Sequence, residues 1–462
     1  MVSRKIAPGK ARRSIAAAQC NVANVKNLTT TVRGAMLDMA RPVSARSEIA
    51  SNLRFIEDGL LVAQDGLIVY SGPWDSSKVP GAPESVMHFP GKLIVPGFID
   101  THVHYPQAEM IGAYGEQLLD WLNQYAFPTE QRYADIEYAR KMADFFVREL
   151  LRNGTTTALV FCTVHPESVD ALFETAQRID MRVIAGKVLM DQNAPDYLLD
   201  TAISGYESSK ALIEKWHKKG RLLYAITPRF APTSTDQQLA MAGKLKGEYP
   251  DVYVHTHLSE NRAEIDWVKD LFPGHDGYLD VYHHHGLTGS RSVFAHCVHL
   301  RDHEWKCLSD TESAIAFCPT SNLFLGSGLF PLKKSWERGV RVGMGTDVGA
   351  GTSFSMLQTL NEAYKVAQLQ NDKLSAFEAF YLATLGGAKS LSLDHLLGNF
   401  DVGKEADFIV LDPGATPLLQ KRNETCLDLE QRLFALFTLG DDRCIHSTFV
   451  NGTLAFEREG KI

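Results

Sequence analysis

The chain has 462 residues, of which 45% are hydrophobic and 22% are charged. This composition is ordinary for a globular protein, and no apolar run approaches the roughly 18 residues that a membrane span needs. The 47 Lys and Arg and the 55 Asp and Glu give a formal net charge of -8, which offers no basic surface for nucleic acid or anionic lipid. These numbers argue against both partners and favour a small molecule.

The length of the chain limits the number of domains, and its cysteines indicate the redox state of its compartment. The chain is roughly two to three times the usual domain size, yet one barrel domain can occupy well over half of it. We therefore expect one large domain and one accessory domain. The seven cysteines are odd in number and form no CxxC pair. This favours a reducing compartment over a disulfide framework, and we expect a cytoplasmic protein.

Residues 1–33 differ in composition from the rest of the chain. They contain seven Lys and Arg, no Asp or Glu, and little hydrophobic periodicity. We predict a disordered extension here. A targeting peptide and a misassigned start are the alternatives, although the segment has no apolar secretory core.

Short apolar runs broken by Gly and Asp occur near both ends of the chain. Such runs are typical of strands and tight turns in antiparallel sheets. They lie at residues 59–62, 66–70 and 92–95, and again at 407–411 and 447–452. We predict that residues 34–95 and 400–462 pair into one discontinuous β-sandwich domain.

Residues 96–399 alternate strands with amphipathic helices, which is typical of a parallel α/β fold. In one predicted helix, Thr129 offers the N-cap, apolar residues recur at helical spacing as far as Leu150, and Asn153-Gly154 ends the helix. The eight predicted strands end near residues 104, 161, 189, 227, 257, 296, 317 and 347. Eight such strands are enough to close a (β/α)8 barrel, so we predict an α/β protein with a TIM-like barrel at 96–399.

The stretch from Asp100 to His104 is the most informative one in the chain. Because alternate side chains of a strand share a face, Asp100, His102 and His104 point into the barrel while Val103 points toward the helices. Two imidazoles placed in this way can chelate one metal ion. A single buried histidine is more often an ordinary core residue, but a His-x-His pair on an inward face is far rarer.

Three later strands end in residues of the same type. His255 and His257 both face inward on the fifth strand, so spacing alone does not choose between them; the C-terminal position of barrel active sites favours His257. His296 ends the sixth strand. Asp347 follows the eighth, and although a lone Asp there is usually a cap or turn residue, this one coincides with ligand-type residues on the same rim.

Three His and one Asp suit Zn²⁺ or Fe²⁺ better than Mg²⁺ or Ca²⁺, which prefer oxygen ligands. A cation in such a site lowers the pKa of a water molecule toward roughly 7. Hydrolysis then needs an acid that protonates the leaving side, and Glu260, three residues beyond His257, is placed for that role. The alternative for Glu260 is an exposed residue at a helix start.

Taken together, four motifs resemble the amidohydrolase superfamily, and the resemblance extends from about residue 95 to 412. They are PGFIDTHVH at 96–104, HTHLSEN at 255–261, FAHC at 294–297 and GTDVGAG at 345–351. The segment at 402–407 belongs to the same pattern and leads the chain back into the small domain in that superfamily. The resemblance implies that one zinc ion is bound by His102, His104, His257 and Asp347.

Three further features resemble the members that hydrolyse guanine to xanthine and ammonia. They are HYPQ at 104–107, GKVLMD at 186–191 and PRF at 228–230. This resemblance implies that Gln107 and Arg229 hydrogen-bond the purine, with His257, Glu260 and Asp347 at its reacting edge, and that Phe230 packs on the ring. Members of the superfamily commonly form dimers, so a homodimer is expected.

The same resemblance implies the proton transfers. His296 would steady the attacking water, and Glu260 would carry a proton to the ring nitrogen. Asp347 would take a proton from the water and pass it to the departing amine. Some members hold two metals through a carboxylated Lys on the fourth strand, but here that strand ends in Arg229 and Lys187 lies on the third, so we expect one ion.

Alternative interpretations remain at this stage. An enzyme for another heteroaromatic ring, such as 8-oxoguanine, an s-triazine or a pterin, would share the metal site and differ only around Gln107, Arg229 and Phe230. A metal-free scaffold protein is the alternative of another class, and the retention of all four ligand types argues against it. The deaminase fold with a P-C-x-x-C zinc motif is excluded because the chain has no CxxC. The run His283–His285 is predicted to be a solvated helix end rather than a metal site.

Overall fold

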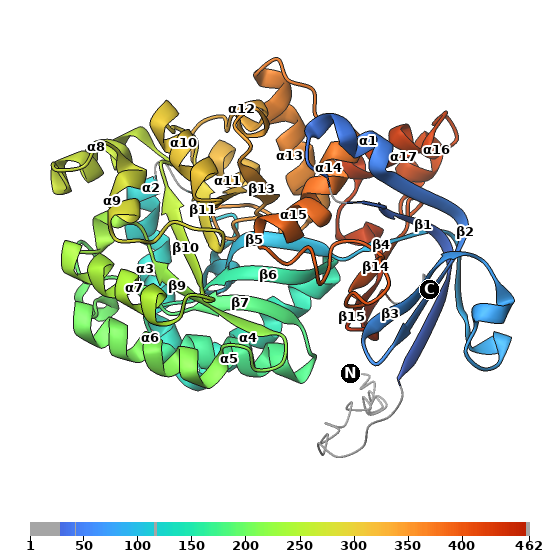
Figure 1. The fold of residues 1–462 in the computed structure, drawn as a ribbon, viewed down its shortest axis with the longest axis horizontal. Coiled ribbons are helices and arrows are strands. Elements are labelled where there is room, and N and C mark those ends of the chain that lie inside the picture. The colour runs from blue at the N-terminus through green and yellow to red at the C-terminus, as the bar shows by residue number, and fades with distance from the viewer. Residues whose placement is uncertain (1–27, 42, 115–117, 459–462) are drawn as a thin grey trace, which may run out of the picture.

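The computed structural model describes residues 28–41, 43–114 and 118–458 (Figure 1). Two sheets organise these residues, one closed into a barrel and one built from both ends of the chain. The predicted fold class, a (β/α)8 barrel with a small β domain, is confirmed. Among the described residues, every helix is too short or too polar to cross a membrane.

Eight parallel strands form the barrel, and a ninth, β8 (Val188–Leu189), pairs only with β9. In order round the barrel they are β5 (Phe98–His104), β6 (Thr155–Phe161), β7 (Arg182–Gly186), β9 (Leu222–Pro228), β10 (Tyr253–Leu258), β11 (Ser292–His296), β12 (Ala314–Phe317) and β13 (Arg341–Met344). The predicted strand ends agree with these bounds to within three residues, the largest differences being residue 189 against Gly186 of β7 and Asp347 against Met344 of β13.

Side-chain and backbone hydrogen bonds close the barrel between its first and last strands. Thr101 Oγ1 on β5 donates to Met344 O on β13 at 2.9 Å, and Asp347 N donates to His102 O at 2.9 Å. The carboxylate of Asp100 accepts from Thr346 N at 3.1 Å. The closure therefore brings the residues after β13 directly against the inward face of β5.

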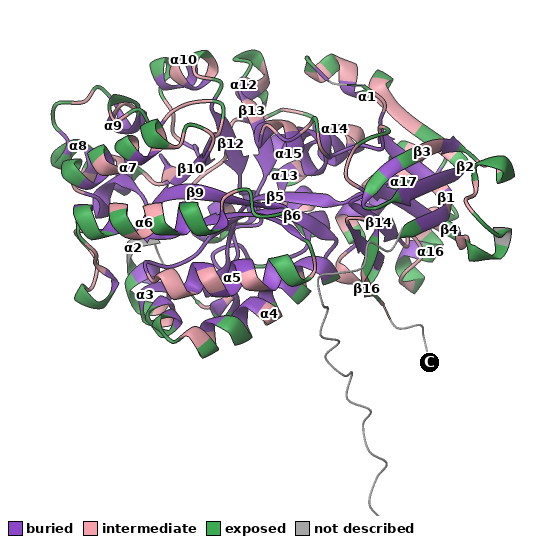
Figure 2. Ribbon diagram, turned by 60° about the horizontal axis from the view of Figure 1, so that its bottom comes forward, coloured by how far each residue is buried: buried purple, intermediate pink, exposed green. Residues whose placement is uncertain are grey.

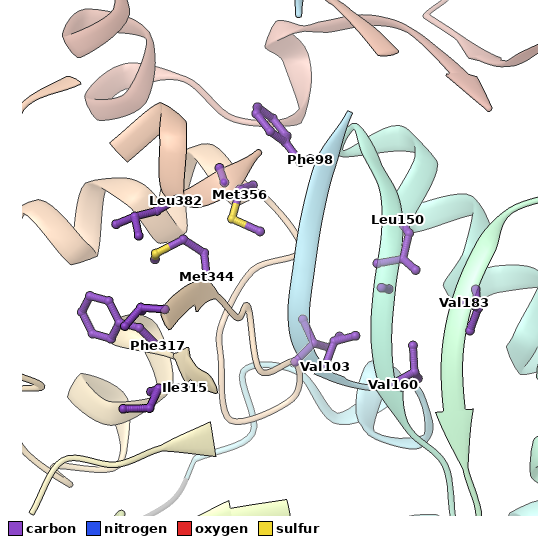
Figure 3. Packing of buried hydrophobic residues seen from close by; sticks show 14 of the residues in the cluster. Phe98, Val103, Leu150, Val160, Val183, Ile315, Phe317, Met344, Met356 and Leu382 are labelled. Carbon is purple, nitrogen blue, oxygen red and sulfur yellow. The ribbon is translucent and has the colours of Figure 1, made fainter. Parts of the chain in front are cut away.

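Helices cover the outside of the barrel, and their apolar faces pack on the strands (Figure 2). They are α4 (Ile136–Arg152), α5 (Pro166–Arg178), α6 (Ala202–Trp216), α7 (Asp236–Glu248), α8 (Arg262–Leu271), α9 (Tyr278–His284), α10 (Asp302–Asp310), α11 (Pro319–Phe324), α12 (Leu332–Glu337), α13 (Met356–Leu369), α14 (Ala376–Ala383) and α15 (Leu385–Ser390). Val103 of β5 lies in the same buried apolar cluster as Leu150 of α4, together with Val160 and Val183 of the next strands (Figure 3). Burying each of these side chains contributes about 1.5–3 kcal/mol.

One helix start differs from the prediction. Helix α4 begins at Ile136, and its N-cap is Asp135, whose Oδ1 accepts from Glu137 N at 2.9 Å. Thr129, which the pattern suggested as the cap, lies in a separate short helix, α3 (Phe127–Glu130). Asp and Thr are both good N-cap residues, so the apolar spacing did not separate them. The extra segment of α2 (Leu118–Trp121), η5 (Leu122–Ala126) and α3 stands between β5 and α4.

The small sheet has seven strands in the order β16, β15, β14, β4, β1, β2, β3. Its members are β1 (Thr29–Met39), β2 (Leu53–Gln64), β3 (Leu67–Pro73), β4 (Met87–Pro96), β14 (Phe408–Leu411), β15 (Ile445–Val450) and β16 (Thr453–Glu457). Every neighbouring pair is antiparallel except β1 and β4, which are parallel. The short helices α1 (Ile49–Asn52), α16 (Pro417–Asn423) and α17 (Leu429–Leu439) come from the same terminal segments.

The predicted domain boundaries at 33, 95 and 400 stay predictions. Residues 1–27 of the predicted disordered extension lie outside the described residues, and β1 begins at Thr29, so the sheet already includes the end of that range. Strand β4 ends at Pro96, one residue past the second boundary.

A buried ion network joins the small sheet to the N-terminal end of the barrel. Glu405 lies in the segment that returns to β14, and its Oε2 accepts from Arg182 Nε at 2.9 Å and from Arg221 NH2 at 2.7 Å. Arg221 NH1 also donates to Asp407 Oδ1 at 3.1 Å. Burial opposes ionisation of Glu405, but the two guanidinium groups outweigh it and lower the pKa of this carboxyl below its ordinary value.

We expect Glu405→Gln to lower the free energy of unfolding by about 3 kcal/mol at pH 7, because it leaves two buried guanidinium groups short of a carboxylate. A lowered folded-state pKa stabilises above the unfolded pKa of about 4.3 and loses that effect as pH falls through the folded value. The difference from the parent should therefore shrink in acid. Guanidinium chloride unfolding at pH 7 and pH 4 measures both. Glu137→Gln, in a solvent-exposed pair with Arg140, is the control and should change nothing measurable; equal losses in the two variants would contradict the role of the network.

Candidate active site and metal centre

A cavity lies at the C-terminal ends of the barrel strands, where barrel enzymes hold their active sites. All the predicted site residues except His102 line it. The lining residues are His104, Gln107, Trp121, Leu122, Arg229, Phe230, His257, Glu260, Glu264, His296, Leu325, Asp347 and Ala350. His102 lies fully buried directly beneath, within contact of His104 and Asp347.

Four side chains from three strands converge on one point. His104 Nε2 is 3.2 Å from both His102 Nε2 and His257 Nε2, and Asp347 Oδ1 is 3.2 Å from His102 Nε2 and 3.4 Å from His104 Nε2. Tetrahedral zinc with bonds of about 2.0–2.1 Å has ligand atoms roughly 3.3–3.4 Å apart. The donor set and its spacing therefore fit one zinc ion.

In two of these rings, Nδ1, the nitrogen that points away from the cluster, already has a hydrogen-bond partner. His257 Nδ1 lies 2.6 Å from the carbonyl oxygen of Arg229, which only accepts, so Nδ1 carries the proton and Nε2 presents a lone pair. His102 Nδ1 lies 2.7 Å from His255 Nε2 and is oriented by it. Burial lowers the pKa of His102, His104 and His257 well below the ordinary value, so the rings are neutral, as metal ligands must be.

Depth separates the two histidines of β10. His257 lines the cavity, whereas His255 is buried inside the barrel and contacts the far side of the His102 ring. The two-residue period of a strand predicted that both His255 and His257 face inward, and it did not decide which of them is the metal ligand. His255 thus acts behind the ligand cluster, on a residue of the first strand.

Other ligand combinations are less compact. Among the described residues, ligand-type atoms lie within 4.8 Å of one another in the triads His102, His257, His296 and His102, Cys318, Asp347. Burial raises the pKa of Cys318 well above its ordinary value, so its thiol stays protonated and is a poor ligand. Both triads omit His104, whose Nε2 is only 3.2 Å from two neighbours. We therefore favour the set of three histidines and Asp347.

An acid and a further imidazole flank this cluster. Glu260 is 2% exposed, which contradicts the alternative of an exposed helix-start residue, and its Oε1 accepts from Ser327 Oγ at 2.8 Å. His296 Nε2 lies 3.4 Å from Glu260 Oε2 and 3.8 Å from Asp347 Oδ2. Burial raises the pKa of Glu260. Burial alone would lower the pKa of His296, but the two carboxylates outweigh it and raise that pKa, so the group can hold a proton.

Asn322 is a site residue that sequence reasoning left out. Its Oδ1 lies 2.8 Å from His296 Nδ1, which orients the ring so that Nε2 faces the two carboxylates. Asn322 lies within α11 and contacts His296, so its role is to hold a neighbouring side chain.

The side chains predicted to bind the substrate line the same cavity. Gln107 lies in η4 (Tyr105–Met110), directly after β5, and Arg229 directly follows β9. Phe230 lies next to Arg229, and its ring meets Trp267 edge-on at 6.2 Å. Glu130 was missed: its buried carboxylate accepts from Gln107 Nε2 at 3.0 Å and from Arg229 NH1 at 2.6 Å.

The chain belongs to the amidohydrolase family, whose model matches residues 93–455. It is 66% identical over 429 residues to guanine deaminase of Escherichia coli K12, which covers 92% of this chain and 98% of that relative. A solved structure of E. coli guanine deaminase matches with a TM-score of 0.91 at 63% identity, covering 94% of this chain and all of the other.

Two further similar structures were solved with a ligand or a metal ion bound. Guanine deaminase from C. acetobutylicum, solved with guanine bound in its active site, has a TM-score of 0.84 and 31% identity and covers 93% of this chain and 100% of that one. An adenosine deaminase from Xanthomonas campestris with bound zinc has a TM-score of 0.79, covering 92% of each chain. At 22% identity, that second likeness shows the fold alone.

We expect removal of metal by a chelator to lower the melting temperature, because an ion that binds only the folded chain stabilises it by about 4 kcal/mol at 1,000 times its Kd. Thermal unfolding and elemental analysis of loaded and chelated protein measure this. His257→Ala should lose the ion. His283→Ala, at the exposed end of α9, is the matched control and should keep it. Metal-free protein with an unchanged melting temperature would argue against a metal centre.

Proposed function

We infer that this hydrolase converts guanine and water to xanthine and ammonia. The observation that carries the inference is one cavity lined both by an imidazole and carboxylate cluster and by the side chains of Gln107 and Arg229. Identity of 66% to a guanine deaminase, over nearly the full length of both chains, supports the same reaction.

We propose one Zn²⁺ ion per chain, with Fe²⁺ as the alternative, bound by His102, His104, His257 and Asp347. The atom separations of 3.2 to 3.4 Å and the neutral state of the three rings support this ligand set. When bound, the ion would polarise a water molecule and lower its pKa toward about 7. The chain's own groups then orient the purine and move the protons.

We propose that Gln107 and Arg229 hydrogen-bond the carbonyl edge of the purine while Phe230 packs on its ring. A planar guanidinium gives directional recognition of a carbonyl oxygen that the ammonium of a Lys would not reproduce. Adenine carries an amine at that edge. Donors that face an amine remain unpaired in a buried site, which costs about 1–3 kcal/mol and supports discrimination against adenine.

We propose that Glu260 donates a proton to the ring nitrogen beside C2 as water adds to that carbon. Attack at C2 removes the aromaticity of the ring, and protonation of the adjacent nitrogen lowers this barrier. Asp347 takes one proton from the water and passes it to the departing amine, which leaves as ammonia. The hydroxyl that remains on C2 returns its proton to Glu260 as the carbonyl of xanthine forms. His296, oriented by Asn322, steadies the water and the oxygen that develops charge.

We propose that residues 96–399 are the catalytic domain and that 34–95 and 400–462 form the accessory domain. We further propose a cytoplasmic homodimer that acts in purine catabolism. The six cysteines among the described residues are all free thiols, which supports a reducing compartment.

Incubation of the purified protein with guanine, adenine, cytosine and 8-oxoguanine, followed by ammonia release, tests the substrate. We expect a clear preference for guanine, because its carbonyl edge matches the donors of Gln107 and Arg229. A preference for 8-oxoguanine or another ring would overturn the specificity and leave the mechanism standing. Loss of all activity with metal present would overturn both.

We expect Glu260→Gln to keep the metal and to lose about 10²- to 10⁴-fold in kcat, the usual contribution of a positioned proton donor. Steady-state kinetics and metal analysis measure the two effects. Glu405→Gln, which removes a partly buried carboxylate at the opposite end of the barrel, is the control and should retain kcat. A Glu260→Gln variant that turned over near the parent rate would show that another group carries the proton.

A further inference from the structure

We propose that Glu130 is a positioning residue that determines specificity, because its carboxylate orients Gln107 and Arg229 so that both present only N–H groups to the substrate. This inference rests on the proposed function and deepens it. It assigns the requirement for a carbonyl oxygen on the ring to a residue that lies outside the strand ends and outside the sequence motifs described above.

Each oxygen of Glu130 accepts from a different recognition side chain. Oε1 lies 3.0 Å from Gln107 Nε2, and Oε2 lies 2.6 Å from Arg229 NH1. Glu130 is fully buried, and Gln107 and Arg229 are 2% and 3% exposed. Such short contacts between buried charged partners are strong and hold both side chains in one geometry.

The segment around Glu130 holds Arg229 from a second direction. Phe127, one turn earlier in α3, places its ring 5.2 Å from the guanidinium carbon. Arg229 is thus fixed by a carboxylate and an aromatic face on the same short helix. The ion pair with Glu130 uses an N–H of NH1 only, and Arg229 lines the cavity, so its other N–H groups can donate to a ligand.

The carboxylate also decides which way the Gln107 amide faces. A carboxylate accepts and does not donate, so Gln107 must turn Nε2 rather than Oε1 toward it. Oε1 is thereby turned to the backbone N–H of Gly349, 3.4 Å away. The second N–H of Nε2 remains for the ligand. Gln107, which could offer either a donor or an acceptor, is restricted to donating.

A ring edge that meets two donors must bring acceptors. Guanine offers its carbonyl oxygen there. In 2,6-diaminopurine that oxygen is replaced by an amine, while the 2-amino group that leaves in the reaction is retained. This compound would set donors against donors, and each unpaired buried group costs about 1–3 kcal/mol. It is therefore the probe that isolates the effect of Glu130.

We expect Glu130→Gln to relax this selection. The new side chain has one accepting oxygen and one donating nitrogen, so the Gln107 amide can reverse and turn Oε1 into the cavity. KM for guanine should rise about tenfold or more with a smaller change in kcat, and kcat/KM for 2,6-diaminopurine relative to guanine should rise about tenfold or more. Unchanged KM and unchanged selectivity in this variant would overturn the proposal.

Two further variants separate positioning from folding. Glu130→Asp remains a pure acceptor, so it should keep the parent's low activity on 2,6-diaminopurine even if KM rises; relaxed selectivity there would overturn the proposal. Glu405→Gln also removes a carboxylate bonded to two side chains, but this carboxylate is partly buried and lies at the far end of the barrel. It should lower the melting temperature and leave KM and the selectivity ratio unchanged.

The wild-type protein distinguishes this inference from the function on which it rests. If the parent does not deaminate guanine, the proposed function fails. If the parent deaminates guanine and the Glu130→Gln ratio equals that of the parent, only the role of Glu130 fails. Metal content, measured on every variant, should be the same as in the parent, because Glu130 contacts the recognition side chains and not the ligand cluster.

Discussion

The site depends on four ligand atoms, three on buried side chains and one on the partly exposed His257, whose measured neighbouring separations are 3.2 to 3.4 Å. The proton of His257 lies on Nδ1, opposite the Arg229 carbonyl, so its Nε2 directs a lone pair at its neighbours, and the Asp347 carboxylate adds negative charge. Crowding polar lone pairs in a buried space is unfavourable unless a cation accepts them. The surrounding fold therefore has to prevent these four side chains from moving apart.

The barrel supplies that restraint through its strands and their closure. His102 and His104 share the inward face of β5, and the backbone of Asp347 donates to His102 O, so the carboxylate and one imidazole are tied together. At the strand ends, His296 and Asp347 adopt positive φ angles of 71° and 51°. Such non-glycine conformations cost about 1–3 kcal/mol each and persist only where the surrounding structure enforces them. Here they turn each side chain into the cavity.

The features that could be predicted from the sequence obey short-range rules. Period-two alternation placed both histidines of β5 on one face, and the C-terminal strand ends gave the rim. Depth within the barrel, which separates His257 from His255, has no local signal. Glu130 lies 23 residues from Gln107 and 99 from Arg229, and no local pattern links them. Because Thr129 was interpreted as the N-cap of the following helix, α3, the short helix that contains Thr129 and Glu130, was not predicted.

The proposed metal ligands and the proposed recognition residues lie on different kinds of structure. Three of the proposed ligands lie on strands β5 and β10. The fourth, Asp347, lies in the segment that follows β13, and its backbone N–H donates to His102 O on β5. Gln107, Glu130 and Arg229 lie instead on η4, on α3 and just after β9, in connections that the barrel tolerates in many forms. Substitutions in these connections can change which ring edge is accepted without moving a ligand atom. A shared metal site therefore carries little information about the substrate, and the orientation of the Gln107 amide carries a large part of it.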